Sequence, residues 1–197
     1  MNLITIRAIL ILFFVVFCSE ARSDNFNYDF VQASFISSDS SAPGVNIEGD
    51  GNTLEFSYSL FDELAVNTSI NTGTFDNKAD GKNISFGALF HTAMSEFSDI
   101  NVGLFIGKTE VSLPGQSPIN SNDGYLLYGV RSRLSEYIEL DLSVLFLDVS
   151  DHLSHAYEIG TIIGNSNGLQ VELLYSYNEI SASSKIEKIT FGVIYSF

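Results

Sequence analysis

The chain has 197 residues, a formal net charge of −15 at pH 7, 45% hydrophobic residues and only 17% charged residues. This length suits one domain. The hydrophobic content excludes a disordered chain, and the acidic balance excludes a basic nucleic-acid-binding face. No apolar run reaches the roughly 20 residues that a membrane-spanning helix needs. A membrane protein of this composition would carry its apolar residues in alternation with polar ones.

Residues 1–23 contain the three parts of a secretory signal peptide. Arg7 supplies a short basic start, residues 8–18 form an unbroken apolar run, and Ala21-Arg22-Ser23 fits a cleavage site. The apolar run is too short for a membrane anchor, so we expect cleavage after Ser23 or Ala21 and one exported domain over 24–197. Cys18, the only cysteine, would leave with the peptide, so we expect neither disulfide nor thiol chemistry.

From residue 26 onward, large apolar residues alternate with small or polar ones, a pattern typical of β-strands with two different faces. The clearest example places Ile189, Phe191, Val193, Tyr195 and Phe197 on one face. Ten segments of this kind are predicted, at 28–36, 54–61, 64–75, 84–93, 100–111, 124–134, 136–149, 156–163, 168–179 and 188–197. Most are near the 9–11 residues of a tilted membrane strand. They predict about ten strands, with eight as the fallback.

The connections between these segments alternate in length. Short turns are predicted near 61–63, 94–96, 134–136 and 165–167, and mostly longer polar loops at 37–51, 76–82, 112–123, 150–155 and 180–184. Short turns on one rim and longer loops on the other are typical of outer-membrane barrels. We therefore predict an all-β fold, a closed antiparallel transmembrane β-barrel with both chain ends on the short-turn side.

The same alternation would also fit an exported soluble barrel or sandwich, whose apolar face points inward. Two features favour lipid. The more polar face is rich in Gly, Ser, Ala and Asn, which suit the cramped interior of a narrow barrel. The apolar face carries aromatic residues such as Tyr128, Tyr175 and Tyr195 near strand ends, as in the aromatic girdles of membrane barrels.

Two strands resemble those of small Gram-negative outer-membrane β-barrels. The ending Phe191-Gly192-Val193-Ile194-Tyr195-Ser196-Phe197 resembles the terminal strand of such proteins, and residues 128–134, Tyr-Gly-Val-Arg-Ser-Arg-Leu, resemble the Gly-x-Arg-x-x-Leu strand of the OmpX-like, outer membrane protein beta-barrel domain group. The resemblance implies a place in the outer membrane of a Gram-negative bacterium. It also implies that Phe191, Val193, Tyr195 and Phe197 form a signal for the barrel-assembly machinery. It implies no activity.

Nine ionisable residues are predicted to face the lumen: Glu55, His91, Arg131, Arg133, Glu139, Asp141, Glu158, Glu172 and Lys188. A tight turn at Ser135 and the matching of faces place Arg131 opposite Glu139. Buried charges must be paired or hydrated. We therefore expect an internal salt-bridge network that plugs and stiffens the barrel. The alternative is a narrow gated pore whose ion pairs rearrange.

Enzymatic and metal-binding signals are weak. Asp148, Ser150, Asp151, His152 and His155 gather in one predicted outer loop, but the sequence lacks a Gly-x-Ser-x-Gly nucleophile elbow. Residues 48–52 and 76–81 resemble calcium loops in composition and miss the EF-hand spacing. We expect no catalytic residue, metal or cofactor, and an outer-membrane hydrolase is the least favoured alternative.

The predicted function is that of a non-enzymatic integral outer-membrane barrel with a structural or surface-interaction role, and a small, gated pore is the alternative. We expect a monomer. Its expected partners are outer-membrane lipid, lipopolysaccharide and the barrel-assembly machinery, and nucleic acid is not among them.

Overall fold

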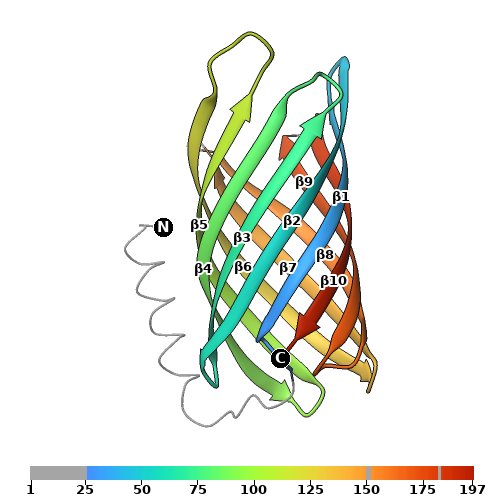
Figure 1. Ribbon diagram of the computed structural model, residues 1–197. Coiled ribbons are helices and arrows are strands. Elements are labelled where there is room, and N and C mark those ends of the chain that lie inside the picture. The colour runs from blue at the N-terminus through green and yellow to red at the C-terminus, as the bar shows by residue number, and fades with distance from the viewer. Residues whose placement is uncertain (1–25, 150–151, 182) are drawn as a thin grey trace.

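The structure is a computed structural model that describes residues 26–149, 152–181 and 183–197. These residues form ten strands: β1 (Phe30–Ala42), β2 (Val45–Phe61), β3 (Leu64–Phe75), β4 (Asp80–Ser95), β5 (Ser98–Ser112), β6 (Ile119–Ser135), β7 (Ile138–Val149), β8 (His152–Gly164), β9 (Leu169–Ser181) and β10 (Ser184–Ser196). Each strand pairs antiparallel with its neighbours, and β1 pairs with β10, which closes the barrel (Figure 1). The predicted fold and the strand number of ten are confirmed.

The proposed signal peptide over residues 1–23 lies outside the described residues. Within the described part of the chain, no helix is long and apolar enough to cross a membrane.

Both ends of the described chain lie at one rim of the barrel, which we call the terminal rim. The carboxyl terminus lies beside the start of β1 (Figure 1). The connections at this rim are the short segments 62–63, 96–97, 136–137 and 165–168, as the sequence predicts. The opposite rim, which carries the other five connections, is called the hairpin rim.

Three of the turns at the terminal rim share one design. The strand register shifts at Leu60, Met94 and Leu134, and a two-residue turn follows two positions later in each case. In these three pairs the outward residues of both strands have even numbers, so matched faces need pairs whose numbers sum to an even value. A two-residue turn alone would give odd sums here and would put outward residues opposite inward ones. The β-bulge adds one residue and returns both strands to matching faces. These bulges therefore let short turns join strands without exchanging the two faces.

The polar loops predicted for the hairpin rim are shorter than the sequence suggests. Residues 37–51 are mostly strand, because β1 and β2 continue to a two-residue turn at Pro43 and Gly44, and the other connections comprise residues 76–79, 113–118, 150–151 and 182–183. Gly44 has a φ of +78°, the left-handed conformation that the third position of a type II turn needs. Serine, asparagine and aspartate are depleted in strands by propensity, but continuous pairing, such as Asp39 with Glu48, overrides it here.

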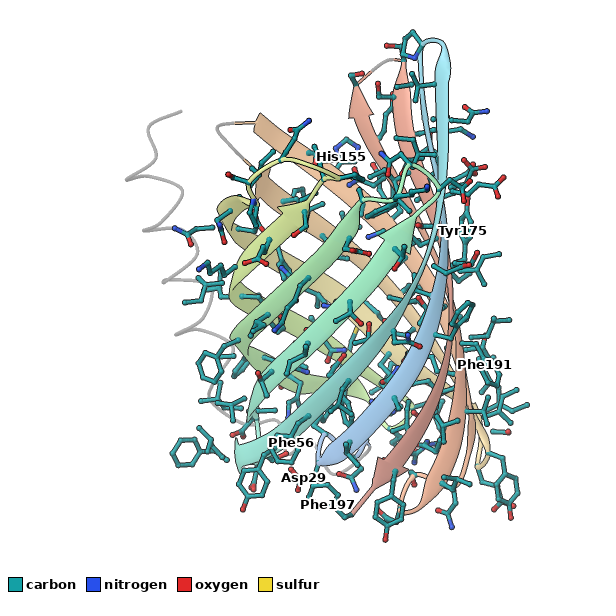
Figure 2. All side chains as sticks on the ribbon, turned by 45° about the horizontal axis from the view of Figure 1, so that its top comes forward. Asp29, Phe56, His155, Tyr175, Phe191 and Phe197 are labelled. Carbon is teal, nitrogen blue, oxygen red and sulfur yellow. The ribbon has the colours of Figure 1, made fainter. Side chains whose placement is uncertain are left out.

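The large apolar side chains point outward, as predicted. Leu104 and Ile106 in β5 are 63% and 71% exposed. Tyr175 and Phe191 project from the outer surface in Figure 2. Towards the hairpin rim the outward residues become polar, for example Lys108 two residues after Ile106. The outside of the barrel is therefore an apolar band with a polar collar above it.

The interior contains more large apolar side chains than the alternating pattern predicts. Several of them line a cavity in the lumen: Leu89, Phe105, Tyr125, Leu127, Leu145, Ile162, Leu174 and Ile194. Phe105 stacks on Tyr125 with ring centroids 4.5 Å apart, and its ring occupies the space that a Cβ would need at Gly87 or Gly103. The small interior residues therefore make room for large ones, which fill the lumen between them.

Candidate functional site: the lumen and its closed end

The lumen holds a cavity of about 340 Å³ that extends from Asn27 and Tyr28 towards the hairpin rim. Tyr28 lines its end nearest the terminal rim, and Thr53 and Lys188 line its end nearest the hairpin rim. Four carboxylate side chains line it, together with two cationic ones: Glu55, Asp141, Glu158 and Glu172, with Arg131 and Lys188. The cavity wall is therefore rich in acidic groups.

All nine ionisable residues predicted for the lumen are placed inside the barrel. Six of them line the cavity, as given above, and Glu139 is buried against Arg131. His91 and Arg133 lie nearer the terminal rim, where they line a second cavity of about 450 Å³. The set is thus divided between two levels of the lumen.

Arg131 forms the central ion pair of the lumen. Its Nε donates to Oε2 of Glu139 at 2.8 Å, and its Nη2 lies 2.5 Å from the same oxygen. Arg133 Nη2 lies 3.6 Å from the other oxygen of Glu139. Arg131 is only 7% exposed, so this pair is desolvated and must be held by geometry.

The predicted register around this pair is wrong by two residues. Arg131 lies opposite Asp141, and Arg133 lies opposite Glu139. The bulge at Leu134 moves the turn towards the carboxyl terminus and shifts the pairing while keeping the faces matched. Arg131 still reaches Glu139, because long side chains bridge diagonal neighbours in a sheet.

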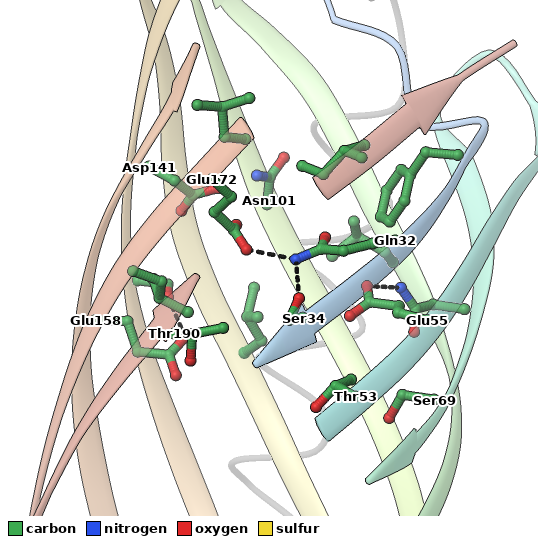
Figure 3. Close-up of a pocket in the computed structure, with 18 of the residues that line it drawn as sticks. Gln32, Ser34, Thr53, Glu55, Ser69, Asn101, Asp141, Glu158, Glu172 and Thr190 are labelled. Atoms are coloured by element: carbon green, nitrogen blue, oxygen red, sulfur yellow. Dashed lines mark hydrogen bonds between the residues drawn. The ribbon is translucent and has the colours of Figure 1, made fainter. Parts of the chain in front are cut away.

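The acidic wall is held mainly by neutral hydrogen-bond donors. Glu55 accepts a hydrogen bond from Asn67 Nδ2 at 2.6 Å, and Glu158 accepts one from the Ser143 hydroxyl at 3.0 Å. Glu172 accepts one from Gln32 Nε2 at 2.5 Å (Figure 3). These neutral donors fix the carboxyl groups in place without placing a positive charge beside them.

Gly192 makes the contact between Gln32 and Glu172 feasible. These two side chains belong to β1 and β9 and meet across β10, directly above Gly192. A Cβ at position 192 would lie 2.7 Å from Gln32 Nε2 and 2.7 Å from the Ser34 hydroxyl oxygen. The missing side chain therefore lets a hydrogen bond span two strand widths.

Residues 26–29, before the first strand, enter the barrel at the terminal rim. Phe26 and Tyr28 are 6% and 3% exposed. The Tyr28 ring stacks on His91 with centroids 3.7 Å apart, and its hydroxyl donates to Asn101 Oδ1 at 2.7 Å. Burial raises the pKa of this hydroxyl above its ordinary value, so it stays a neutral donor. We call residues 26–29 the N-terminal segment.

The guanidinium groups of the lumen also contact this segment. Arg131 lies 5.3 Å from the centroid of the Phe26 ring and 5.6 Å from that of Tyr28, and Arg133 lies 5.0 Å from that of Phe26. These distances fall within the range of cation–π attraction. The ion pair and the two aromatic rings thus form one packed cluster.

The N-terminal segment is fastened to the rim by polar contacts as well. Asp29 Oδ1 accepts a hydrogen bond from the backbone of Ser59 at 2.5 Å. Asn27 Nδ2 lies 3.2 Å from Asn167 Oδ1 and 3.2 Å from the carbonyl oxygen of Phe197, as a donor to each. The segment is therefore held both inside the lumen and along its edge.

Sequence reasoning missed this segment and one buried acid. Asp99 is fully buried beneath Tyr28 and lies 3.9 Å from His91 Nδ1. The alternation of Phe26 and Tyr28 is too short to show that both enter the barrel. Asp99 alternates along β5 with Asn101 and Gly103, which lie on the inward face, and this spacing was the signal that could have identified it.

A chain of hydrogen bonds lines the lumen towards the hairpin rim. Thr53 donates to Asn71, Asn71 donates to Asn83 at 3.3 Å, and Asn83 donates to Thr109 at 2.8 Å. Thr109 in turn donates to Asp123. This ladder crosses five consecutive strands, from β2 to β6, and stiffens that side of the barrel.

The described residues on either side of the candidate catalytic loop are strand. Strand β7 ends at Val149 and β8 begins at His152, and residues 150–151 lie outside the described residues. His155 meets Tyr157 edge to face, with ring centroids 5.2 Å apart. Among the residues that the structure describes, no group of three or more His, Cys, Asp or Glu side chains is arranged to hold a metal ion.

No protein-family model matches this sequence, and no curated protein matches it. Similar solved structures are outer-membrane proteins. The translocator domain of the autotransporter NalP from Neisseria meningitidis is 13% identical, with a TM-score of 0.55 over 89% of this chain and 91% of that one. The COG4313 outer membrane channel from Pseudomonas putida F1 is 7% identical, with a TM-score of 0.53 over 91% and 100%.

The attachment invasion locus protein Ail of Yersinia pestis is 16% identical, with a TM-score of 0.41 over 87% of this chain and 99% of that one. The resemblance to the NalP translocator domain and to the COG4313 channel shows the fold, that of an outer-membrane β-barrel.

Proposed function

We propose that this protein is a non-enzymatic integral β-barrel of the outer membrane of a Gram-negative bacterium, which presents its hairpin rim to the surroundings of the cell. The continuous apolar band on the outside of a closed sheet carries this proposal. Exposed apolar patches on soluble proteins rarely exceed a few hundred Å². In lipid the band needs no cover, and a closed sheet leaves no unpaired backbone groups at an edge.

The strand lengths support a surface role for the hairpin rim. Crossing the hydrocarbon layer takes roughly 9–11 tilted residues, whereas β2 and β6 have 17 each. The surplus residues continue the paired sheet beyond the apolar band, where the outward side chains are polar, among them Asp50, Thr74 and Lys82. A rigid polar collar of this kind suits contact with lipopolysaccharide and with molecules outside the cell.

The outward residues Phe191, Val193, Tyr195 and Phe197 support recognition by the barrel-assembly machinery. All four are exposed; the first three lie on the outward face of β10, which pairs with β1, and Phe197 follows the last residue of that strand. A cleaved signal peptide over residues 1–23 would deliver the chain to that machinery. A monomer agrees with this assignment, because the closed barrel leaves no free strand edge for a second copy.

Site-directed labelling tests the location and the orientation together. A membrane-impermeant maleimide should label Ser117→Cys, between β5 and β6, in intact cells. Asp62→Cys, between β2 and β3, should be labelled after the outer membrane is permeabilised. The unsubstituted protein controls for Cys18, and a soluble fraction containing the folded protein, or equal labelling of both sites in intact cells, would refute the proposal.

An open pore is less well supported, because the buried side chains of the N-terminal segment lie between the two cavities of the lumen. The protein reconstituted into planar lipid bilayers should therefore give no single-channel currents. A steady current from the unmodified protein would favour the pore instead.

A further inference from the structure

The N-terminal segment is a partition between two cavities. Asn27 and Tyr28 line the 340 Å³ cavity above and also the 450 Å³ cavity at the terminal rim. The upper cavity extends along the lumen as far as Thr53 and Lys188. The side chains of one short segment, packed against His91, Arg131 and Arg133, thus lie between the two cavities.

The contacts described above that hold this segment are hydrogen bonds and ring contacts. The Tyr28 hydroxyl bonds to Asn101, its ring stacks on His91, and Asp29 and Asn27 bond to the rim. The segment precedes β1, whose pairs with β2 and β10 begin at Phe30. Its withdrawal would break one backbone hydrogen bond, from Phe197 to the Asp29 carbonyl oxygen, and would leave these strand pairs intact. The barrel can therefore stay closed as a sheet while its terminal end opens.

The wall of the upper cavity determines what could pass. Four carboxylates face it, whereas one of its two cationic groups, Arg131, is bound to Glu139. The wall therefore carries more carboxyl groups than cationic groups. A negatively lined passage with low-dielectric walls concentrates cations and repels anions.

We propose that the barrel is a latent cation channel, closed by residues 26–29 and opened for small hydrated monovalent cations when that segment leaves the lumen. This proposal rests on the membrane location proposed above, which the maleimide labelling decides separately. It adds an activity that the closed state does not display.

Planar-bilayer recording on the purified full-length protein tests it with a matched pair of variants. Phe26→Ala combined with Tyr28→Ala removes the partition. Phe56→Ala combined with Tyr58→Ala removes the same two side chains from the outer face. Heat-modifiable migration on gels establishes that each variant is folded before recording.

The partition variant should conduct, and in a potassium chloride gradient its reversal potential should have the sign expected for potassium. The outer-face variant and the unmodified protein should stay silent. Adding Glu158→Gln and Glu172→Gln to the partition variant should reduce its preference for potassium over chloride. Should the double variant fail to fold, Tyr28→Ala alone carries the same test.

A folded partition variant as silent as the unmodified protein would overturn the proposal. So would a current without preference for cations, or a current through the outer-face variant equal to that of the partition variant. If any of these results were obtained and Ser117→Cys were still labelled in intact cells, the channel proposal would fail and the proposed membrane location would stand.

Discussion

Arg131 connects three features of the interior: the ion pair with Glu139, the aromatic rings of the N-terminal segment, and the acidic cavity. A buried pair of this kind contributes little net stability, but losing one partner leaves the other charge desolvated and unpaired. The sequence predicts an inward Arg131 near Glu139 from alternation alone. It does not predict the contact with Phe26, because that contact joins parts of the chain about a hundred residues apart.

Replacing Arg131 by alanine should lower the free energy of unfolding by about 3–5 kcal/mol, the usual cost of breaking a buried pair. Lys108→Ala should change it by no more than roughly 0.5 kcal/mol, because Lys108 is exposed on the outer collar. The gel-resolved folded fraction in a urea series measures both. Arg131→Met combined with Glu139→Leu removes both charges, so it should cost less than Arg131→Ala alone. Equal losses for Arg131→Ala and Lys108→Ala would contradict the internal ion pair.

Gly192→Ala should destabilise the barrel by about 1–3 kcal/mol, because the new Cβ would displace Gln32 and leave Glu172 without its donor. Gly124→Ala is the matched control, since a Cβ there meets its nearest neighbour, the Phe105 carbonyl oxygen, at 3.7 Å. That substitution should be neutral or slightly stabilising. Urea midpoints measured side by side decide the matter, and equal losses would show that any side chain on a strand glycine is harmful here.

At the scale of the strands, alternation was enough to predict their number, their direction and their outward faces. It failed where both faces become polar, as in β1 and β2 between residues 37 and 51, because period-two hydrophobicity vanishes once a strand leaves the apolar band. It also failed at the bulges, such as that at Leu134, since one extra residue leaves no mark in composition. The strand register near the turns could therefore be assigned only from the backbone pairing in the structure.

The apolar band makes a prediction that separates a membrane barrel from a soluble one. Leu104 in β5 is outward, between Val102 and Ile106, near the middle of the band. Leu104→Arg should lower stability in lipid vesicles by about 2–4 kcal/mol, the cost of arginine at the bilayer midplane. Asn52→Arg, outward on the collar, should have little effect. If the protein were soluble, both would change stability by roughly 0.5 kcal/mol or less.

At the scale of the whole molecule, closure depends on contacts between the two ends of the chain. Strand β1 pairs with β10 along its length, and the backbone of Phe197 donates to the Asp29 carbonyl at 3.1 Å. Alternation and an even strand number predict that the ends meet at one rim. They say nothing of the residues just before β1, whose entry into the lumen depends on the space that the inward side chains leave.

Phe197 lies at this closure, where packing and recognition by the assembly machinery can be separated. On the outer face its ring lies 6.3 Å from that of Phe56, centroid to centroid. Phe197→Ala and Phe56→Ala remove the same aromatic contact, but only the first alters the terminal strand. If residues 191–197 are an assembly signal, Phe197→Ala should reduce folded protein in the membrane fraction several-fold, whereas Phe56→Ala should not. Both should refold equally well from urea into detergent, since that reaction involves no machinery; equal losses in cells would instead assign the effect to packing.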